Sequence, residues 1–219
     1  MEKIEKNQEF ENVVGHIEFM RGNAFQKANR EFILICYDVG LTVSKKMAEG
    51  SWDDNAVEAL ADFLQNRYKT SVSFTISNIG RMKQFYEVYF SDDFLKPLEK
   101  QLEDFFKPAV PTNTEETQTR LFTELLSEIT WTNHLEILSR TKAPEERFFY
   151  LVNCLHERWS LREFRRRLDS DFYFKAMLLG QVVTPPSTQF PEDLFEEPYI
   201  LEFFNLPLGH TKKDLENDL

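Results

Sequence analysis

The sequence predicts an all-α protein, and three observations support this. Apolar residues recur at helical spacing along most of the chain. Only 7 of the 219 residues are glycine, which is few for a chain rich in tight turns. Aromatic residues make up 14% and include 21 Phe, which favours a packed interior over a disordered chain. We expect a multi-helix domain with helix-turn-helix-like segments in two lobes, and no sheet beyond a hairpin.

The first 90 residues predict three helices. A helical apolar pattern runs from about Gln8 to Ala48, with Gly22 as a point where a break could occur. Gly50 follows as a C-cap candidate. A second helix starts after a new capping stretch and ends near Tyr68, and Thr75 caps a third.

The second and third of these helices have the outline of a helix-turn-helix unit. Ser77, Arg81 and Gln84 are predicted to face outward on the third helix. A tight turn between two helices, with polar groups outward on the second, is the arrangement of DNA-binding units. Many helical domains that do not bind DNA share it, so it supports no more than a hypothesis.

The stretch from Ser91 to Thr119 is predicted to be irregular and acidic. Its proline residues are expected to interrupt helices. They are Pro97, Pro108 and Pro111. Apolar residues spaced from Phe94 to Phe105 could still form one amphipathic helix. We predict an exposed loop from Lys107 to Glu116.

The second half of the chain predicts a series of shorter helices. One covers about 121–129 and the next 131–139. Pro144 is a favourable first residue for a third, which is apolar nearly all round and is therefore expected to be buried. Residues 172–179 could add a last short helix, and the Pro-, Thr- and Ser-containing stretch after 180 has the composition of a linker.

The most basic helix of the chain is predicted between Trp159 and Leu168. Ser160 followed by Glu163 forms a capping box, in which the serine hydroxyl accepts from the third amide of the helix. The side of this helix that faces the core is predicted to consist of Leu161, Phe164 and Leu168.

At about 100° per residue, Arg162 and Arg166 point away from that core side, and Arg165 and Arg167 flank it. An apolar underside with exposed arginines is typical of a helix that contacts nucleic acid. The alternative is an ordinary solvated helix whose arginines pair with nearby acids. We refer to Arg162, Arg165 and Arg166 as the arginine row.

The charge of the whole molecule opposes nucleic-acid binding. The formal net charge is -11, which makes non-specific attraction to nucleic acid or to an anionic membrane unfavourable. Any nucleic-acid contact must therefore come from a local basic patch. Cys36 and Cys154 lie in apolar patterns and are expected to be buried free thiols of a reducing compartment. With no signal peptide and no membrane-spanning run, we expect a soluble cytoplasmic protein.

The sequence contains no pattern that indicates catalysis. It lacks a G-x-S-x-G motif, a phosphate-binding glycine loop and a dinucleotide fingerprint. The four histidines are scattered without the spacing of a zinc site, and His134 is expected to form hydrogen bonds at a helix start or interface. We therefore expect this chain to be no enzyme and to hold no cofactor or metal.

Short motifs nevertheless follow one another in a fixed order along the chain. In the first half they are Asn29-x-Glu31-Phe32-Ile33, Tyr37-x-x-Gly40, Gly50-Ser-Trp52, Phe74-Thr75, Asn78-Ile79, Met82-Lys83 and Phe85-Tyr86. In the second half they are Trp131-Thr-Asn-His134, Arg147, Phe149-Tyr150 and Trp159-Ser160-x-Arg162-Glu163. The series resembles the N-terminal domain of the YhcG-like family of bacterial PD-(D/E)XK nucleases, a domain of unknown function. Departures from its pattern are Thr75 in place of serine, Lys83 in place of arginine and Arg167 in place of glutamine.

The resemblance implies a domain organisation. Residues 1–180 would form the helical N-terminal domain, with lobes at about 1–90 and 118–180 and an irregular insertion at about 91–117. Residues 181–219 would lead towards a nuclease domain that lies beyond this chain. A divalent metal such as Mg²⁺ is expected only in that domain.

We therefore expect a non-catalytic nucleic-acid-binding or targeting module of a nuclease, with DNA favoured over RNA. Its partners would be nucleic acid and its own nuclease domain, with a homodimer as a further possibility and no membrane. The candidate contact residues are Arg162, Arg165, Arg166, Ser77, Asn78, Arg81 and Lys83. Two of them have simpler alternatives, since Asn78 could cap or cross-link helices and Lys83 could pair with Glu87. The rival hypothesis is a protein-interaction or dimerisation scaffold, which the acidic balance and the many aromatic residues would suit.

Overall fold

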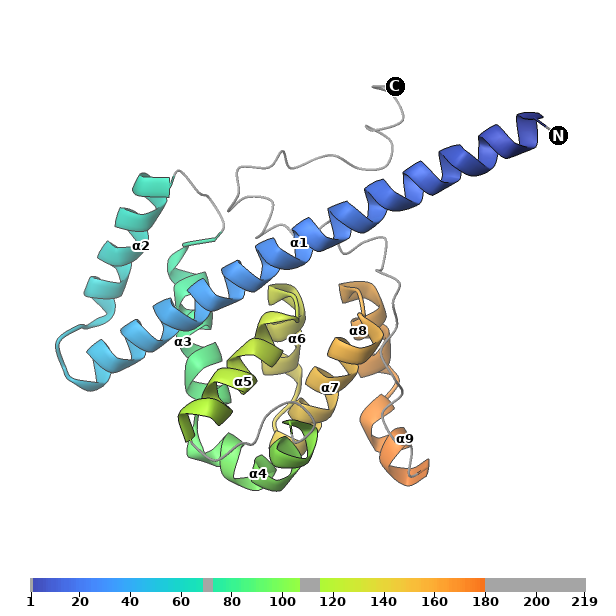
Figure 1. Ribbon diagram of the computed structural model, residues 1–219. Coiled ribbons are helices and arrows are strands. Elements are labelled where there is room, and N and C mark those ends of the chain that lie inside the picture. The colour runs from blue at the N-terminus through green and yellow to red at the C-terminus, as the bar shows by residue number, and fades with distance from the viewer. Residues whose placement is uncertain (1, 69–72, 107–114, 180–219) are drawn as a thin grey trace.

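The computed structural model describes residues 2–68, 73–106 and 115–179. Every regular element in these ranges is an α-helix, which confirms the predicted all-α class (Figure 1). The helices are α1 (Glu2–Ala48), α2 (Asp54–Tyr68), α3 (Ile76–Tyr89), α4 (Asp92–Phe106), α5 (Glu115–Ser127), α6 (Trp131–Arg140), α7 (Pro144–Glu157), α8 (Leu161–Asp169) and α9 (Phe172–Leu179).

Helix α1 is one continuous helix of 47 residues, so the break considered at Gly22 does not occur. Its C-terminal half crosses the other helices, and its N-terminal part projects beyond them (Figure 1). The predicted cap at Gly50 is confirmed. Gly50 has φ +68°, a conformation that glycine adopts without strain. Its amide donates to the Met47 carbonyl at 3.0 Å, which closes the last turn.

The start of each neighbouring helix follows its local sequence. Asp53 caps α2 by accepting a hydrogen bond from the Ala56 amide at 2.9 Å, and Thr75 caps α3 through the Asn78 amide at 3.2 Å. Pro144 opens α7 as predicted. Short polar residues and a first-turn proline therefore set the limits of the helices that surround the core.

The prediction that Pro97 interrupts the chain is wrong, because Pro97 lies inside α4. A proline in a helix interior costs about 3 kcal/mol through its lost amide and its ring. Its ring is exposed, while Phe94 and Leu98 of the same helix are buried. Burial of two such side chains contributes about 1.5–3 kcal/mol each, which offsets the cost of the proline. Of the loop expected at 107–116, residues 115 and 116 are helical, and 107–114 lie outside the described residues.

Residues from both predicted lobes share one hydrophobic core. It contains Phe32 of α1, Phe85 of α3, Trp131 of α6 and Tyr150 of α7. The rings meet edge-on or tilted, with centroids 5.5 Å apart for Phe85 and Trp131 and 6.4 Å for Phe32 and Trp131. The proposed lobe boundaries stay a prediction, but the two halves pack as one body around α3.

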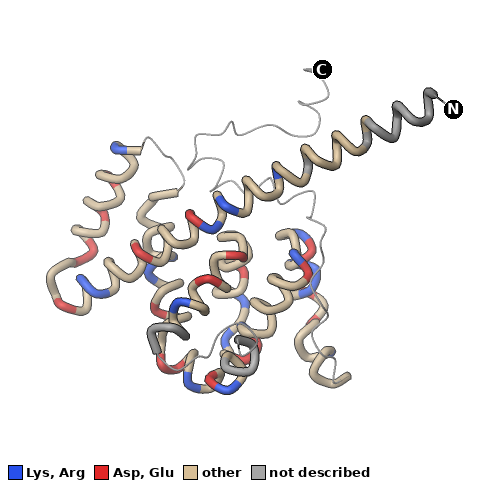
Figure 2. The backbone as a smooth tube through the Cα atoms, viewed as in Figure 1, with Lys and Arg blue, Asp and Glu red and all other residues tan. Residues whose placement is uncertain are grey.

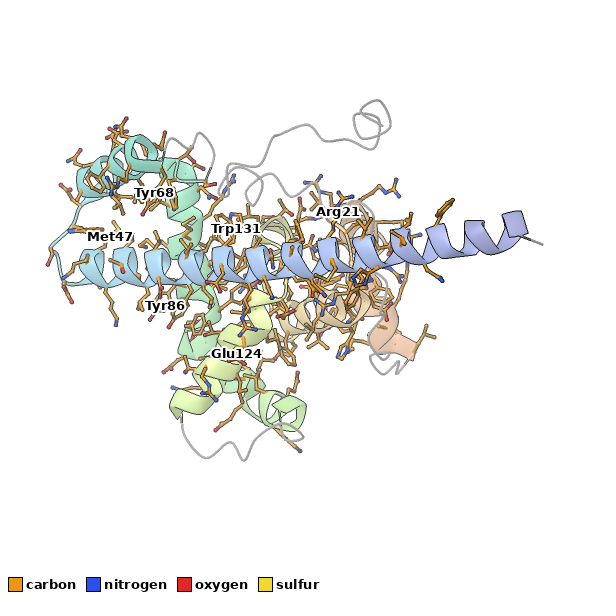
Figure 3. The ribbon with its side chains drawn as sticks, turned by 45° about the horizontal axis from the view of Figure 1, so that its top comes forward. Arg21, Met47, Tyr68, Tyr86, Glu124 and Trp131 are labelled. Atoms are coloured by element: carbon orange, nitrogen blue, oxygen red, sulfur yellow. The ribbon has the colours of Figure 1, made fainter. Side chains whose placement is uncertain are left out.

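Helices α1 and α3 approach each other closely at Gly40. A Cβ atom at this position would collide with the backbone carbonyl of Met82 on α3. Tyr37, one turn earlier, packs edge-on against Tyr86 with ring centroids 5.7 Å apart. Nearer the middle of α1, Arg30 is 3.8 Å from Glu124 of α5 (Figure 3). Helix α1 is therefore fixed to the body along its C-terminal half.

The projecting part of α1 carries an apolar face that no described residue covers. Its members are Phe10, Val13, Val14, Ile17 and Met20, each between 47% and 63% exposed. We call these residues the α1 apolar face. None of the helices in the described part of the chain combines the length and apolar character needed to cross a membrane.

Candidate nucleic-acid interface

Helix α8 carries the arginine row, and its first turn is built as predicted. The Ser160 hydroxyl accepts from the Glu163 amide at 3.3 Å. The second half of the capping box does not form, because the Glu163 carboxylate binds arginines instead. Phe164 is fully buried and Leu168 is nearly so, whereas Leu161 is only half-buried, so the predicted core side is confirmed in two of its three residues.

Buried residues hold the start of α8 in place. The Asn133 side-chain amide on α6 donates to the Trp159 carbonyl at 2.9 Å, directly before the cap. The Trp159 ring stacks on Phe164 with centroids 6.1 Å apart. Tyr150 of the buried helix α7 packs edge-on against the same Phe164. The exposed side of α8 therefore stands on a fixed support.

The arginine row lies on the exposed side of that helix. Arg162 is exposed and forms no ion pair or side-chain hydrogen bond with any residue that the structure describes. The Arg165 and Arg166 side chains are 54% and 71% exposed. In Figure 2 the basic segments of α8 are interspersed with acidic ones. The row is therefore accessible, but it is not a purely basic patch.

Carboxylates already engage two of its three arginines. Arg165 donates through Nε and Nη2 to Glu136 of α6, at 2.8 and 2.6 Å. Arg166 donates through the same two atoms to Glu163, at 2.8 and 2.7 Å. The hydrogen bond from Arg166 is the main reason that the pKa of Glu163 lies below its ordinary value. The alternative that these arginines pair with nearby acids thus describes Arg165 and Arg166, but not Arg162.

Arg167 has a structural position. Its guanidinium lies 5.3 Å from the centre of the Trp159 ring and 4.7 Å from that of Phe172. Its Nε also donates to Glu163 at 2.7 Å. A cation between two rings and a carboxylate is held in place, so Arg167 fastens α8 to the start of α9.

The sequence did not predict the ion pairs that join α8 to α6. Besides Arg165 and Glu136, Arg140 of α6 donates to Asp169 of α8 at 2.5 Å. The partners are 29 residues apart, so no helical spacing links them. Only the general expectation that exposed arginines pair with acids pointed to them.

Asn78 is buried, which argues against its place among the candidate contact residues. It is only 2% exposed. Its side-chain amide donates to the Ser73 carbonyl at 2.6 Å, and its Oδ1 accepts from Trp131 Nε1 at 3.0 Å. Both polar ends are engaged inside the protein, so Asn78 cross-links α3 and α6, as its simpler alternative proposed.

The other candidates on α3 are less restricted. Lys83 pairs with Glu87 at 2.8 Å, and Glu87 also accepts from Ser44 of α1. Lys83 is therefore part of a surface link between α1 and α3. Ser77 and Arg81 are exposed. In Figure 1, α6 and α7 lie between α3 and α8, so these two residues and the arginine row occupy separate parts of the surface.

His134 is a buried structural histidine, as expected. Its Nε2 lies 2.9 Å from the Leu126 carbonyl and its Nδ1 lies 3.3 Å from the Tyr89 hydroxyl. Since a carbonyl can only accept, Nε2 carries the proton and Nδ1 accepts from the tyrosine. Burial lowers the pKa of His134 to about 4, so the ring is neutral at ordinary pH.

Within the described ranges, no three His, Cys, Asp or Glu side chains gather as a metal site. Cys36 and Cys154 are buried and form no disulfide bond, as predicted. Burial raises the pKa of the Cys154 thiol, which keeps it protonated.

Comparison with known proteins places the chain in a family. The model of the DUF1016 N-terminal domain matches residues 12–175. The chain belongs to this family. A curated relative, the Escherichia coli (strain K12) protein named "Putative nuclease YhcG", is 23% identical over 182 residues, covering 78% of this chain and 48% of that protein. The chain thus spans about half the length of this relative. No solved structure matches the chain.

Proposed function

We propose that this DUF1016 N-terminal domain is a non-catalytic nucleic-acid-binding module that directs a nuclease to its substrate, with DNA favoured over RNA. The observation that carries the proposal is the arginine row of α8, and above all Arg162, which is exposed and has no carboxylate partner among the described residues. The name of the relative supports a connection with a nuclease. The metal and the catalytic carboxylates would belong to a separate domain.

The position of Arg162 supports a role in binding over one in stability. It lies in the first turn of α8, where the helix dipole is positive. A cation there is unfavourable by about 0.3–1 kcal/mol, and no described acid forms an ion pair with Arg162. A phosphate would do so, because it brings negative charge to the same turn.

The net charge of -11 requires that binding be local. Arginine suits such a contact, because its planar guanidinium binds a phosphate through two parallel hydrogen bonds. The fixed position of α8 limits the conformational entropy that binding would cost. A small row of rigidly mounted arginines can therefore act against the overall repulsion.

Replacing Arg162 and Arg166 together with alanine tests the proposal. If each neutralises one phosphate, the slope of log affinity against log salt should flatten by about two units. Binding of a fluorescent DNA duplex, measured by anisotropy across a salt series, gives this slope. The thermal midpoint should hardly move, because Ser160 and Phe164 remain in place.

The matched control replaces Arg67 and Arg120, which are exposed on α2 and α5 and lie outside the candidate set. It makes the same change in net charge. A control that weakens binding as much as the double variant would mean that total charge, and not the arginine row, sets the affinity. An unchanged slope in the double variant would also contradict the proposal.

The chain by itself should not cleave DNA or RNA in Mg²⁺ or Mn²⁺. Metal-dependent cleavage needs paired carboxylates that hold the ion, and the sequence offers no such pattern. Incubating supercoiled plasmid and single-stranded RNA with the purified chain tests this. Cleavage that is lost on mutating one carboxylate of the chain would assign it catalytic activity.

The α1 apolar face supports a second candidate function, that of a protein-interaction or dimerisation scaffold. Contiguous exposed apolar residues on a helix often mark protein contacts. Replacing Val13 and Ile17 with glutamate should then abolish a self-association that light scattering detects in the unmodified chain. A monomer that binds DNA through α8 would favour the first function.

A further inference from the structure

We infer, on the basis of the proposed function, that Glu163 limits the affinity of the arginine row by competing with phosphate for Arg166. Glu163 lies in the first turn of α8, between Arg162 and Arg166 on the same helix. It is a positioning residue and would make no favourable contact with nucleic acid itself.

The geometry of the pair shows what phosphate has to replace. Arg166 places Nε and Nη2 on the two different oxygens of Glu163, at 2.8 and 2.7 Å. This is the edge of the guanidinium that binds a phosphate through two parallel hydrogen bonds. A phosphate that binds this edge through two hydrogen bonds must displace the carboxylate. A phosphate that binds the other edge of the guanidinium instead must lie close to Glu163. Either arrangement leaves a negative carboxylate near a negative phosphate, and this lowers affinity.

The displaced carboxylate would still have a partner. Arg167 donates to the same oxygen, Oε1, at 2.7 Å, and the Trp159 and Phe172 rings hold its guanidinium in place. Arg166 has no such second anchor and is 71% exposed. Arg166 can therefore move from carboxylate to phosphate while Glu163 stays paired with Arg167. In the free protein the pair holds Arg166 on the helix surface.

Glu136 does not have the same role, although it binds Arg165. Its side chain is only 17% exposed, and it belongs to α6. Removing its charge would loosen the contact between α6 and α8. Glu163 lies within α8, so its pair with Arg166 can open without separating two helices.

The test is Glu163→Gln. Glutamine has the same length and keeps the backbone amide that Ser160 caps, but carries no charge. The variant should bind a DNA duplex about three- to tenfold tighter than the unmodified chain, because Arg166 then contacts phosphate without first leaving a carboxylate. The control is Glu58→Gln on α2, an exposed glutamate that makes the same change in net charge. It should alter affinity by less than about twofold.

A double variant separates the proposed route from a general effect. In a chain that carries Arg166→Ala, adding Glu163→Gln should no longer tighten binding, because the arginine to be released is absent. A gain that persists in this background would overturn the inference, as would a Glu163→Gln variant with unchanged affinity. An unmodified chain that does not bind DNA at low salt would overturn the proposed function first, and this inference with it.

Discussion

Helices α3 and α8 both carry basic residues for which the sequence predicts nucleic-acid contacts, yet the structure uses them differently. Both begin at a hydroxyl cap, Thr75 in one and Ser160 in the other. Helix α3 lies inside the body, with α1 on one side and α6 on another, and five of its residues are buried. Helix α8 buries only Phe164 and Leu168 and leaves the arginine row outside.

The difference shows that packing decides what a polar side chain does. On α3, the candidate contact residue Asn78 is engaged within the core by Trp131. On α8, Arg162 and Arg166 are exposed, and none of the described helices covers them. Substitutions of the buried residues of α3 should therefore change stability, and those of the exposed arginines of α8 should chiefly change binding. The following predictions test this contrast, from the largest expected effect on stability to the smallest.

Gly40→Ala should destabilise the protein most, by more than about 3 kcal/mol. The added Cβ would meet the backbone of Met82, which cannot turn aside as a side chain can. The control is Gly80→Ala on the outer side of α3, where a Cβ meets nothing within 4 Å. It should stabilise the helix by about 0.5–1 kcal/mol. Urea denaturation of both variants measures the difference, and equal effects would contradict the close contact of α1 with α3.

Acidification should reduce stability through His134, which contacts Tyr89 of α3. Its pKa in the folded protein is about 4, below the value of 6.5 that it has when exposed. The unfolded chain therefore binds a proton first as pH falls. The contribution of His134 to the free energy of unfolding is therefore fully present above pH 6.5. It is lost as the pH falls from about 6.5 to 4, and the loss amounts to at most about 3 kcal/mol.

Replacing His134 with glutamine should flatten the stability profile between pH 6.5 and 5, above the range where most carboxylates titrate. Free energies of unfolding measured at several pH values test this. A profile with the same slope in both proteins would mean that the ring is accessible to protons in the folded state.

Asn78→Ala should cost about 2 kcal/mol. It removes the acceptor of Trp131 Nε1 and the donor to the Ser73 carbonyl, so two buried groups lose their partner. Its neighbour Ser77 is exposed, and Ser77→Ala should change stability by less than about 0.5 kcal/mol. Thermal denaturation compares them. Weaker DNA binding by a still folded Asn78→Ala variant would return this residue to the contact set.

Arg165→Ala should have an intermediate effect on stability, about 0.5–1 kcal/mol. The pair with Glu136 is half in solvent, which limits its value, but Glu136 is mostly buried and loses its partner. Chemical denaturation measures the loss. A cost above about 2 kcal/mol would make Arg165 primarily structural and remove it from the arginine row.

Arg162→Ala should have the smallest effect on stability, within about 0.5 kcal/mol and in the stabilising direction, because a cation leaves the positive end of α8. DNA affinity should nevertheless fall, and the salt slope should flatten by about one unit. A clear loss of stability would show that Arg162 has a structural partner.

Local sequence signals predicted most of the fold. The caps at Thr75 and Ser160, the first-turn Pro144 and the end at Gly50 all depend on neighbouring residues, and each is confirmed. The prediction that Pro97 interrupts a helix was wrong, because α4 is stabilised by the burial of neighbouring side chains against other helices, which local sequence does not show. Local rules fix where helices begin and end, but not which of them tolerate an unfavourable residue.

The candidate site was less predictable for the same reason. Helical spacing correctly put Arg162 and Arg166 outside, and it offered Glu87 as a partner for Lys83. The partner of Asn78 is 53 residues away, and that of Arg165 is 29 residues away. No spacing rule reaches so far, so the sequence could not show that Arg165 is paired. The pair of Arg166 with Glu163 is only three residues apart, and helical spacing could have indicated it.

The length of α1 has a consequence for how the protein behaves in solution. At about 1.5 Å per residue, its 47 residues extend over about 70 Å. A compact chain of 219 residues has a radius of gyration of only about 17 Å. A monomer with such a projecting rod experiences more friction than a sphere of its mass. It should elute early from a gel-filtration column, as if it were a larger particle than its 26.0 kDa.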